Sequence, residues 1–198
     1  SVSPVGGRWT SALDSLRWRG LQPKMEFISS FDTPYQNITV ARAKSAIGVF
    51  ADGKIAASFP SRETAELEAA LFFSQNPKVR RVLLVEGAAG GLLPELLRYP
   101  VERIDCVEPD ERAFQSLRGA MPPEWGEPFQ DGRVRMVFED PRRFVRRMGV
   151  GAYDLIAALG PDPGTARANR LFTRDFYQEV RGGLSAGGLY VSKMTSAE

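Results

Sequence analysis

VLLVEGAAGGLLPELL, residues 82–97, is the stretch that decides the fold. Its first four residues are branched and apolar, which predicts a buried strand over 82–86. The leucines around and after the glycines recur at helical spacing, which predicts a helix over 91–98. A strand that leads through a tight turn into a helix is the unit from which doubly wound α/β proteins are built, and such turns bind nucleotides or nucleosides.

The turn itself is made of small residues. Glycine at Gly87, Gly90 and Gly91 lets the backbone come close to a ligand, and the helix that follows would direct its free N–H groups to the same place. Ala88 and Ala89 interrupt a complete G-x-G-x-x-G pattern. A turn that needs small residues only for packing therefore stays open as an alternative.

Strands and helices continue to alternate toward the end of the chain. Further strands are expected over 103–107, 133–138, 153–158 and 188–193, helices over 110–119, 141–148 and 172–182, and loops over 119–131 and 160–168. Alternation of this kind predicts βαβ units, and therefore an α/β, Rossmann-like domain with a mainly parallel sheet over 61–198. The last expected strand ends close to the last residue, so we expect the domain to be incomplete at its C-terminal end.

The residues before this domain follow other patterns. Over 25–60 short apolar runs are separated by turns, and Asp52-Gly53 between two such runs is a strong hairpin signal, so a small antiparallel β unit is expected. A helix over 62–74 should link this unit to the Rossmann-like domain. Residues 1–24 carry Trp and Leu at helical spacing among arginines. A linker, an amphipathic helix at a membrane interface and a helix packed on the next domain all fit that segment.

The amino-acid composition limits which catalytic groups and metal ligands the chain can offer. The chain has no histidine, which removes the usual general base and the commonest ligand of zinc and iron, and we expect no metal site. The net charge of +2 predicts no particular polyanionic partner, and no nucleic acid partner is expected. A single cysteine, Cys106, excludes a disulfide framework, is expected to be a buried and inert thiol, and fits a cytoplasmic location.

Acidic residues follow the expected strands after the turn. Glu108 ends the next strand, where a carboxylate would accept hydrogen bonds from the two ribose hydroxyls of a nucleoside. Asp140 ends the strand after it, where it would either accept a hydrogen bond from an adenine amino group or cap the helix that starts at Pro141. Asp162 is a candidate base or an anchor for a cationic substrate, with a turn-forming role as the alternative. Asp110 has a capping role that needs no ligand. The combination predicts a nucleoside site at one edge of the sheet.

A set of short motifs lies in a fixed order over about residues 30–193. They are Tyr35-Gln36-Asn37-Ile38, Asp52-Gly53, VLLVEGAAGG, VEPD (107–110), DGRVRMVFED (131–140), YDLI (153–156), Asp162-Pro163 and LFTRDFY (171–177). This set resembles the spermidine synthase family of aminopropyltransferases. The resemblance implies a methyltransferase-like Rossmann domain behind a small β domain, decarboxylated S-adenosylmethionine as the cofactor, a polyamine as acceptor and a homodimer formed through the β unit. By motif position, Gln36 would contact the thioether side of the cofactor, Glu108 its ribose and Asp140 its adenine.

Three positions depart from the family pattern. The turn G-G-G-D-G-G reads E-G-A-A-G-G over 86–91, so Ala89 replaces the carboxylate that holds the aminopropyl end of the cofactor. D-S-S-D-P reads L-G-P-D-P over 159–163, so Leu159 occupies the position of the usual catalytic base, and the linking helix reads Glu66-Leu67-Glu68 in place of Tyr-His-Glu or Tyr-Gln-Glu. A leucine neither accepts a proton nor binds an ammonium group, so aminopropyl transfer is expected to be altered or lost. The loop that follows Leu159 is similar to that of members fused to membrane-spanning segments.

The sequence therefore predicts a spermidine-synthase-like domain that binds an adenosyl-sulfur nucleoside, either S-adenosylmethionine or its decarboxylated form. Two other functions stay open. A non-catalytic nucleoside-sensing or scaffold domain of a larger membrane protein is favoured by Ala89 and Leu159. An S-adenosylmethionine-dependent methyltransferase is favoured by Glu86, because an acid at this strand end is typical of that fold.

Overall fold

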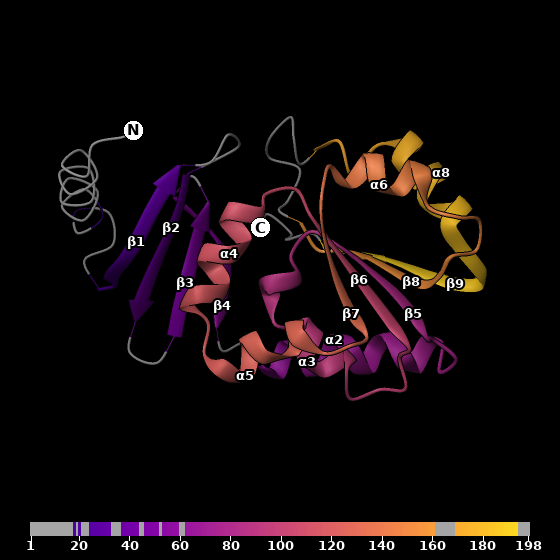
Figure 1. The fold of residues 1–198 in the computed structure, drawn as a ribbon, viewed down its shortest axis with the longest axis horizontal. Coiled ribbons are helices and arrows are strands. Elements are labelled where there is room, and N and C mark those ends of the chain that lie inside the picture. The colour runs from indigo at the N-terminus through magenta and orange to yellow at the C-terminus, as the bar shows by residue number, and fades with distance from the viewer. Residues whose placement is uncertain are drawn as a thin grey trace, which may run out of the picture.

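The computed structural model shows two sheets connected by helix α2 (Arg62–Gln75) (Figure 1). It describes residues 18, 20, 24–32, 37–43, 46–51, 53–59, 62–160 and 169–193. The first sheet is antiparallel with strand order β1-β2-β3-β4, and its strands are β1 (Glu26–Asp32), β2 (Asn37–Ala43), β3 (Ala46–Ala51) and β4 (Lys54–Phe59). The antiparallel pairing of β3 with β4 confirms the predicted hairpin, although Asp52 itself lies outside the described residues.

The second sheet has five strands in the order β7-β6-β5-β8-β9, and all its neighbouring strands are parallel. Its strands are β5 (Arg81–Val85), β6 (Arg103–Glu108), β7 (Val134–Phe138), β8 (Tyr153–Ala158) and β9 (Leu184–Ser192). Every connection between these strands must cross over the sheet, and the helices predicted from the alternating pattern supply the crossovers. The predicted α/β fold, with a small antiparallel unit ahead of a parallel sheet, is thus confirmed.

Helices cover both faces of the parallel sheet, as Figure 1 shows. Successive strand residues point to opposite faces, so Val82 and Leu84 pack on one side while Leu83 and Val85 pack on the other. The first side is covered by α2, α3 (Leu92–Leu96) and α4 (Glu111–Ala120), and the second by α6 (Pro141–Arg147) and α8 (Arg174–Gly183). Because both faces are buried, the strands read as continuous apolar runs.

Another apolar cluster joins the antiparallel sheet to the glycine-rich turn. Ile38 and Val40 of β2 and Val49 of β3 pack with Ala89 of the turn and with Trp125. In Figure 1, α4 lies between the two sheets, and Ala113 of that helix belongs to the same cluster. The antiparallel sheet therefore forms one wall next to the turn.

The outer face of the antiparallel sheet carries Trp18. This indole is 5% exposed and meets the ring of Phe50 edge-on, with the ring centroids 4.6 Å apart. Most of residues 1–24 lie outside the described residues, so the three readings of that segment stay predictions. No helix in the described ranges is long and apolar enough to cross a membrane.

The expectation of a loop over 119–131 was wrong. The stretch contains α5 (Pro123–Gly126) and the 3₁₀ turn η2 (Glu127–Gln130), which bury Trp125 and Phe129. Pro123 and Pro128 occupy the first turns of these elements, where a missing N–H costs nothing and the fixed φ favours the helix, and Pro122 is the N-cap of α5. Two large aromatic side chains then hold the short helices on the core.

The expected element bounds needed two further corrections. In place of one helix over 91–98, a 3₁₀ turn η1 (Ala88–Gly90) precedes α3, because Gly91 between them has a φ of +91° that breaks the helical path. The last strand begins at Leu184, not at 188. It starts earlier because Tyr153 of β8 already pairs with Leu184.

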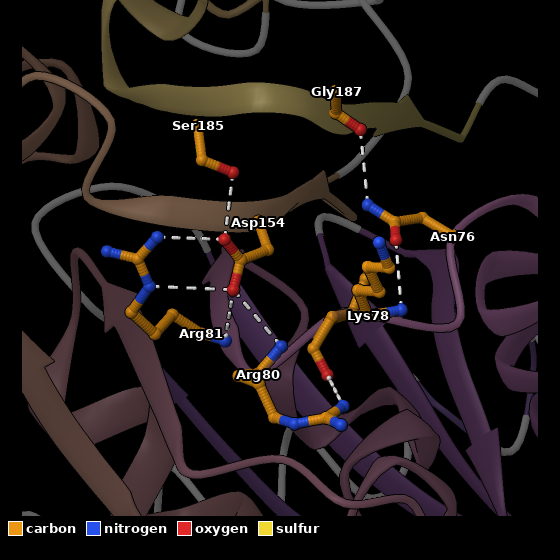
Figure 2. Close-up of polar contacts among 8 residues, drawn as sticks. Asn76, Lys78, Arg80, Arg81, Asp154, Ser185 and Gly187 are labelled. Carbon is orange, nitrogen blue, oxygen red and sulfur yellow. Dashed lines mark hydrogen bonds and ion pairs between the residues drawn. The ribbon is translucent and has the colours of Figure 1, made fainter.

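Asp154 ties together the starts of three strands, at the end of the sheet opposite the glycine-rich turn (Figure 2). Its carboxylate accepts hydrogen bonds from the backbone N–H groups of Arg80 and Arg81 at 3.1 and 2.9 Å, from the Arg81 guanidinium at 2.8 Å, and from Ser185 Oγ at 2.8 Å. Burial acts to raise the pKa of Asp154, but the hydrogen bonds from Arg81, Ser185 and Arg80 outweigh it and lower the pKa well below its ordinary value.

We expect Asp154→Ala to lower the free energy of unfolding at pH 7 by about 2–3 kcal/mol, because a charged acceptor is lost and two backbone donors lose their partner. A carboxyl whose pKa is depressed by folding stabilises the protein above its unfolded pKa, and that contribution is lost as the pH falls through the folded value. The gap between wild type and variant should therefore close in strongly acid solution. Urea unfolding at pH 7 and at acid pH measures it, with Ser185→Ala as the milder control. An equal gap at every pH would contradict the prediction.

Candidate functional site

Two glycines of the turn are required by the fold. Gly87 has a φ of +70°, and a Cβ added there would lie 2.6 Å from the carbonyl oxygen of Leu159. Gly91 has a φ of +91°, and its Cβ would lie 2.3 Å from the Trp125 ring. Both separations are shorter than any real Cβ contact, so packing alone accounts for these two residues.

Gly90 is different. It is exposed, its φ is not positive, and a Cβ added there would have no atom of the described chain within 4 Å. Its N–H donates to the Gly87 carbonyl at 2.8 Å, which closes the 3₁₀ turn. The space in front of Gly90 is therefore open, and a ligand can approach the backbone there.

The structure brings Glu108 to this turn. The Glu108 carboxylate, at the end of β6, accepts a hydrogen bond from the backbone N–H of Ala88 at 2.8 Å. Strands β5 and β6 are parallel neighbours, so their carboxyl ends share one edge of the sheet. The predicted convergence of Glu108 with the glycine-rich turn is found, while its role toward a ligand stays a prediction.

Asp140 lies at the same edge, after β7, and it caps α6. Its carboxylate accepts a hydrogen bond from the backbone N–H of Arg143 at 3.1 Å and pairs with Arg170 at 3.1 Å. Burial acts to raise the pKa of Asp140, but these two partners outweigh it and lower the pKa. The capping role is thus observed. The adenine contact stays a prediction.

The remaining predicted residues divide into two groups. Asp110 caps α4 by accepting a hydrogen bond from the N–H of Ala113 at 3.0 Å, as expected. Cys106 is fully buried, and burial raises the pKa of its thiol, so it is inert as predicted. Gln36 and Asp162 lie outside the described residues.

Glu86 is the site residue that the sequence analysis did not place among the ligand contacts. It directly follows β5, is 8% exposed and has a φ of +56°, a backbone conformation that side-chain-bearing residues rarely adopt. Its Oε2 lies 2.7 Å from the position that a Cβ on Gly160 would take. The sequence feature that could have indicated its role is the position of a charged residue between an apolar strand and a glycine.

The turn is thus flanked by two carboxylates, Glu86 directly after β5 and Glu108 at the end of β6. Such a pair can accept hydrogen bonds from hydroxyl groups and attract a positive charge. Within the described ranges no group of three or more His, Cys, Asp or Glu side chains could hold a metal ion. Ala89 is 8% exposed within the apolar cluster at the antiparallel sheet, and Leu159 continues β8 by donating its N–H to Val85 at 3.0 Å.

Known proteins resemble this chain in sequence and in fold. A polyamine aminopropyltransferase of Clostridium acetobutylicum is 37% identical over 122 residues, which cover 61% of this chain and 42% of that protein. Putrescine N-methyltransferase 4 of Nicotiana tabacum is 36% identical over 121 residues, which cover 61% of this chain and 31% of that protein. The crystal structure of spermidine synthase from Thermotoga maritima has a TM-score of 0.75 at 25% identity, covering 84% of this chain and 56% of that one. The chain spans less than half the length of both curated relatives.

The family model of the spermine/spermidine synthase domain matches residues 66–198, which is well over half of the chain. That range contains the glycine-rich turn, Glu108 and Asp140, and the whole parallel sheet. The chain therefore belongs to the spermine/spermidine synthase family.

Proposed function

We propose that this domain binds an adenosyl-sulfur nucleoside, S-adenosylmethionine or its decarboxylated form, at the carboxyl edge of the parallel sheet. The observation that carries the proposal is the contact between Glu108 and Ala88, which holds a carboxylate beside the open space at Gly90. One oxygen of Glu108 accepts the Ala88 N–H, and the carboxylate keeps further acceptor capacity for ribose hydroxyls. In the proposed complex, Asp140 accepts a hydrogen bond from the adenine amino group, and Gln36 contacts the sulfur side.

Aminopropyl transfer to a polyamine is altered or lost in this proposal. Leu159 has no proton-accepting group, and a carboxylate at the position of Ala89 would be buried among apolar side chains. Asp162 is then the remaining candidate for a base or a cation anchor on the loop after β8. A homodimer formed through the antiparallel sheet also belongs to the proposal.

Calorimetric titration tests the proposal with decarboxylated S-adenosylmethionine, S-adenosylmethionine and methylthioadenosine, followed by an assay for polyamine products. Binding without product formation supports a sensing or scaffold domain. A preference for S-adenosylmethionine together with methyl transfer supports a methyltransferase, the alternative that the similarity to a putrescine N-methyltransferase favours. Absence of binding by all three nucleosides would overturn the proposal.

Glu108→Gln is expected to weaken nucleoside binding about 10- to 100-fold. The amide oxygen can still accept the Ala88 N–H, so the turn keeps its shape, while the charged acceptor for the ribose is lost. The control is Glu102→Gln, which removes the same charge from an exposed residue just before the start of β6, at the far end of the sheet. Calorimetry should show unchanged affinity for the control. Equal affinities for the two variants would contradict the assigned role of Glu108.

A further inference from the structure

Glu86 is held in an unfavourable backbone conformation at the end of the central strand. Its φ of +56° is one that glycine adopts freely and that costs a residue with a side chain of the order of 1 kcal/mol or more. Among the described residues it is the one non-glycine with a positive φ. The chain therefore keeps a glutamate where a glycine would fit the backbone better.

The strained conformation directs the Glu86 side chain toward β8. Its carboxylate fills the space in which Gly160 would carry a side chain, 2.7 Å from that Cβ position. A Cβ added at the next residue, Gly87, would lie 2.6 Å from the Leu159 carbonyl oxygen, so the two segments leave no room for a side chain there either. Because only glycine at position 160 leaves this room, the end of β8 is shaped around a carboxylate, and Leu159 beside it is neutral.

The strand order gives this carboxylate a place along the proposed ligand. The strands lie in the order β7, β6, β5, β8, and their carboxyl ends carry Asp140, Glu108, Glu86 and Leu159 in the same order. A nucleoside with adenine at Asp140 and ribose at Glu108 extends its 5′ substituent in the direction of Glu86. In an adenosyl-sulfur nucleoside, that substituent begins with the sulfur atom.

We propose that Glu86 is the counter-charge of a sulfonium group, so that the site selects a positively charged adenosyl-sulfonium ligand over the neutral thioether. This inference rests on the proposed function. It specifies, in addition, that the ligand is positively charged and that Glu86 is the residue that interacts with this charge. A largely buried carboxylate at short range attracts a cation much more strongly than an exposed one does, because little water screens the pair.

S-Adenosylmethionine and S-adenosylhomocysteine form a suitable ligand pair, because they share the adenosine and the amino acid tail and differ by one methyl group and the positive charge. Wild type is expected to prefer S-adenosylmethionine. Glu86→Gln should reduce the ratio of the two affinities about 10- to 100-fold, with nearly all of the loss on S-adenosylmethionine. Glu102→Gln, an exposed glutamate at the far end of the sheet, should leave the ratio unchanged.

A second variant shows whether a change in affinity comes from the lost charge or from impaired folding. Glu86→Gly removes the charge and relieves the backbone, so it should be at least as well folded as Glu86→Gln and lose the same preference. The inference is overturned if both ligands bind wild type and the variants keep the wild-type ratio of the two affinities, whether the affinities themselves stay the same or fall equally. If neither ligand binds wild type, the proposed function fails first and this inference falls with it.

Discussion

Asp105→Ala is expected to lower the free energy of unfolding by about 3–4 kcal/mol, the largest loss for any polar side chain discussed above. Asp105 is fully buried in the middle of β6. Its carboxylate accepts hydrogen bonds from Arg135 Nε at 2.7 Å and from the Tyr153 hydroxyl at 2.5 Å, and it pairs with Arg103 at 2.8 Å. The two arginines are half exposed and can turn to water, but the Tyr153 hydroxyl is buried and would lose its acceptor.

A double-variant cycle separates this loss from a simple cavity effect. Tyr153→Phe removes the other polar group, so the pair Asp105→Ala and Tyr153→Phe should together cost at least 1 kcal/mol less than the sum of the single changes. Urea unfolding of the four proteins measures the coupling. Additive losses would show that the hydroxyl and the carboxylate do not depend on each other. The Asp105 network joins β6, β7 and β8, and the Asp154 network joins β5, β8 and β9, in the half of the sheet away from the glycine-rich turn.

The position of a site residue can be predicted from the sequence when the contacts that fix it are made by residues nearby in the chain or follow from the strand and helix pattern. The position of Glu108 was predictable, because alternating strands and helices imply a parallel sheet and the ends of its strands share one edge. The Asp110 cap was predictable from the adjacent residues alone. The short helices around Trp125 were not, because the prolines that begin them also mark loops, and burial of the aromatic rings decided between the two.

The direction of Glu86 could not be predicted for a related reason. A residue between a strand and a glycine has several allowed conformations, and the approach of Leu159 and Gly160 from β8 selects the rare one. That contact joins segments far apart in the chain, and a single sequence gives no measure of it. The same holds for Gly91, whose need for glycine comes from Trp125.

Gly91→Ala is expected to destabilise the protein by about 2–4 kcal/mol. An alanine at a φ of +91° is strained by about 1–2 kcal/mol, and displacing a packed aromatic ring costs a further 1–2 kcal/mol. The new methyl group would lie 2.3 Å from Cζ3 of Trp125, so the indole must leave its place against β2 and β3. Thermal unfolding measures the loss, and the near-ultraviolet circular dichroism of the tryptophans should change with it.

Gly90→Ala is the matched control, because it places the same methyl group one residue earlier in the same turn. With an open space in front of it and no positive φ, this variant should unfold within about 0.5 kcal/mol of wild type. Its methyl group would instead enter the space assigned to the nucleoside, so its affinity in calorimetry should fall while its stability does not. Equal destabilisation by the two alanines would contradict the division of this turn into a packed glycine and a ligand-facing one. An unchanged affinity for Gly90→Ala would place the nucleoside elsewhere along the edge of the sheet.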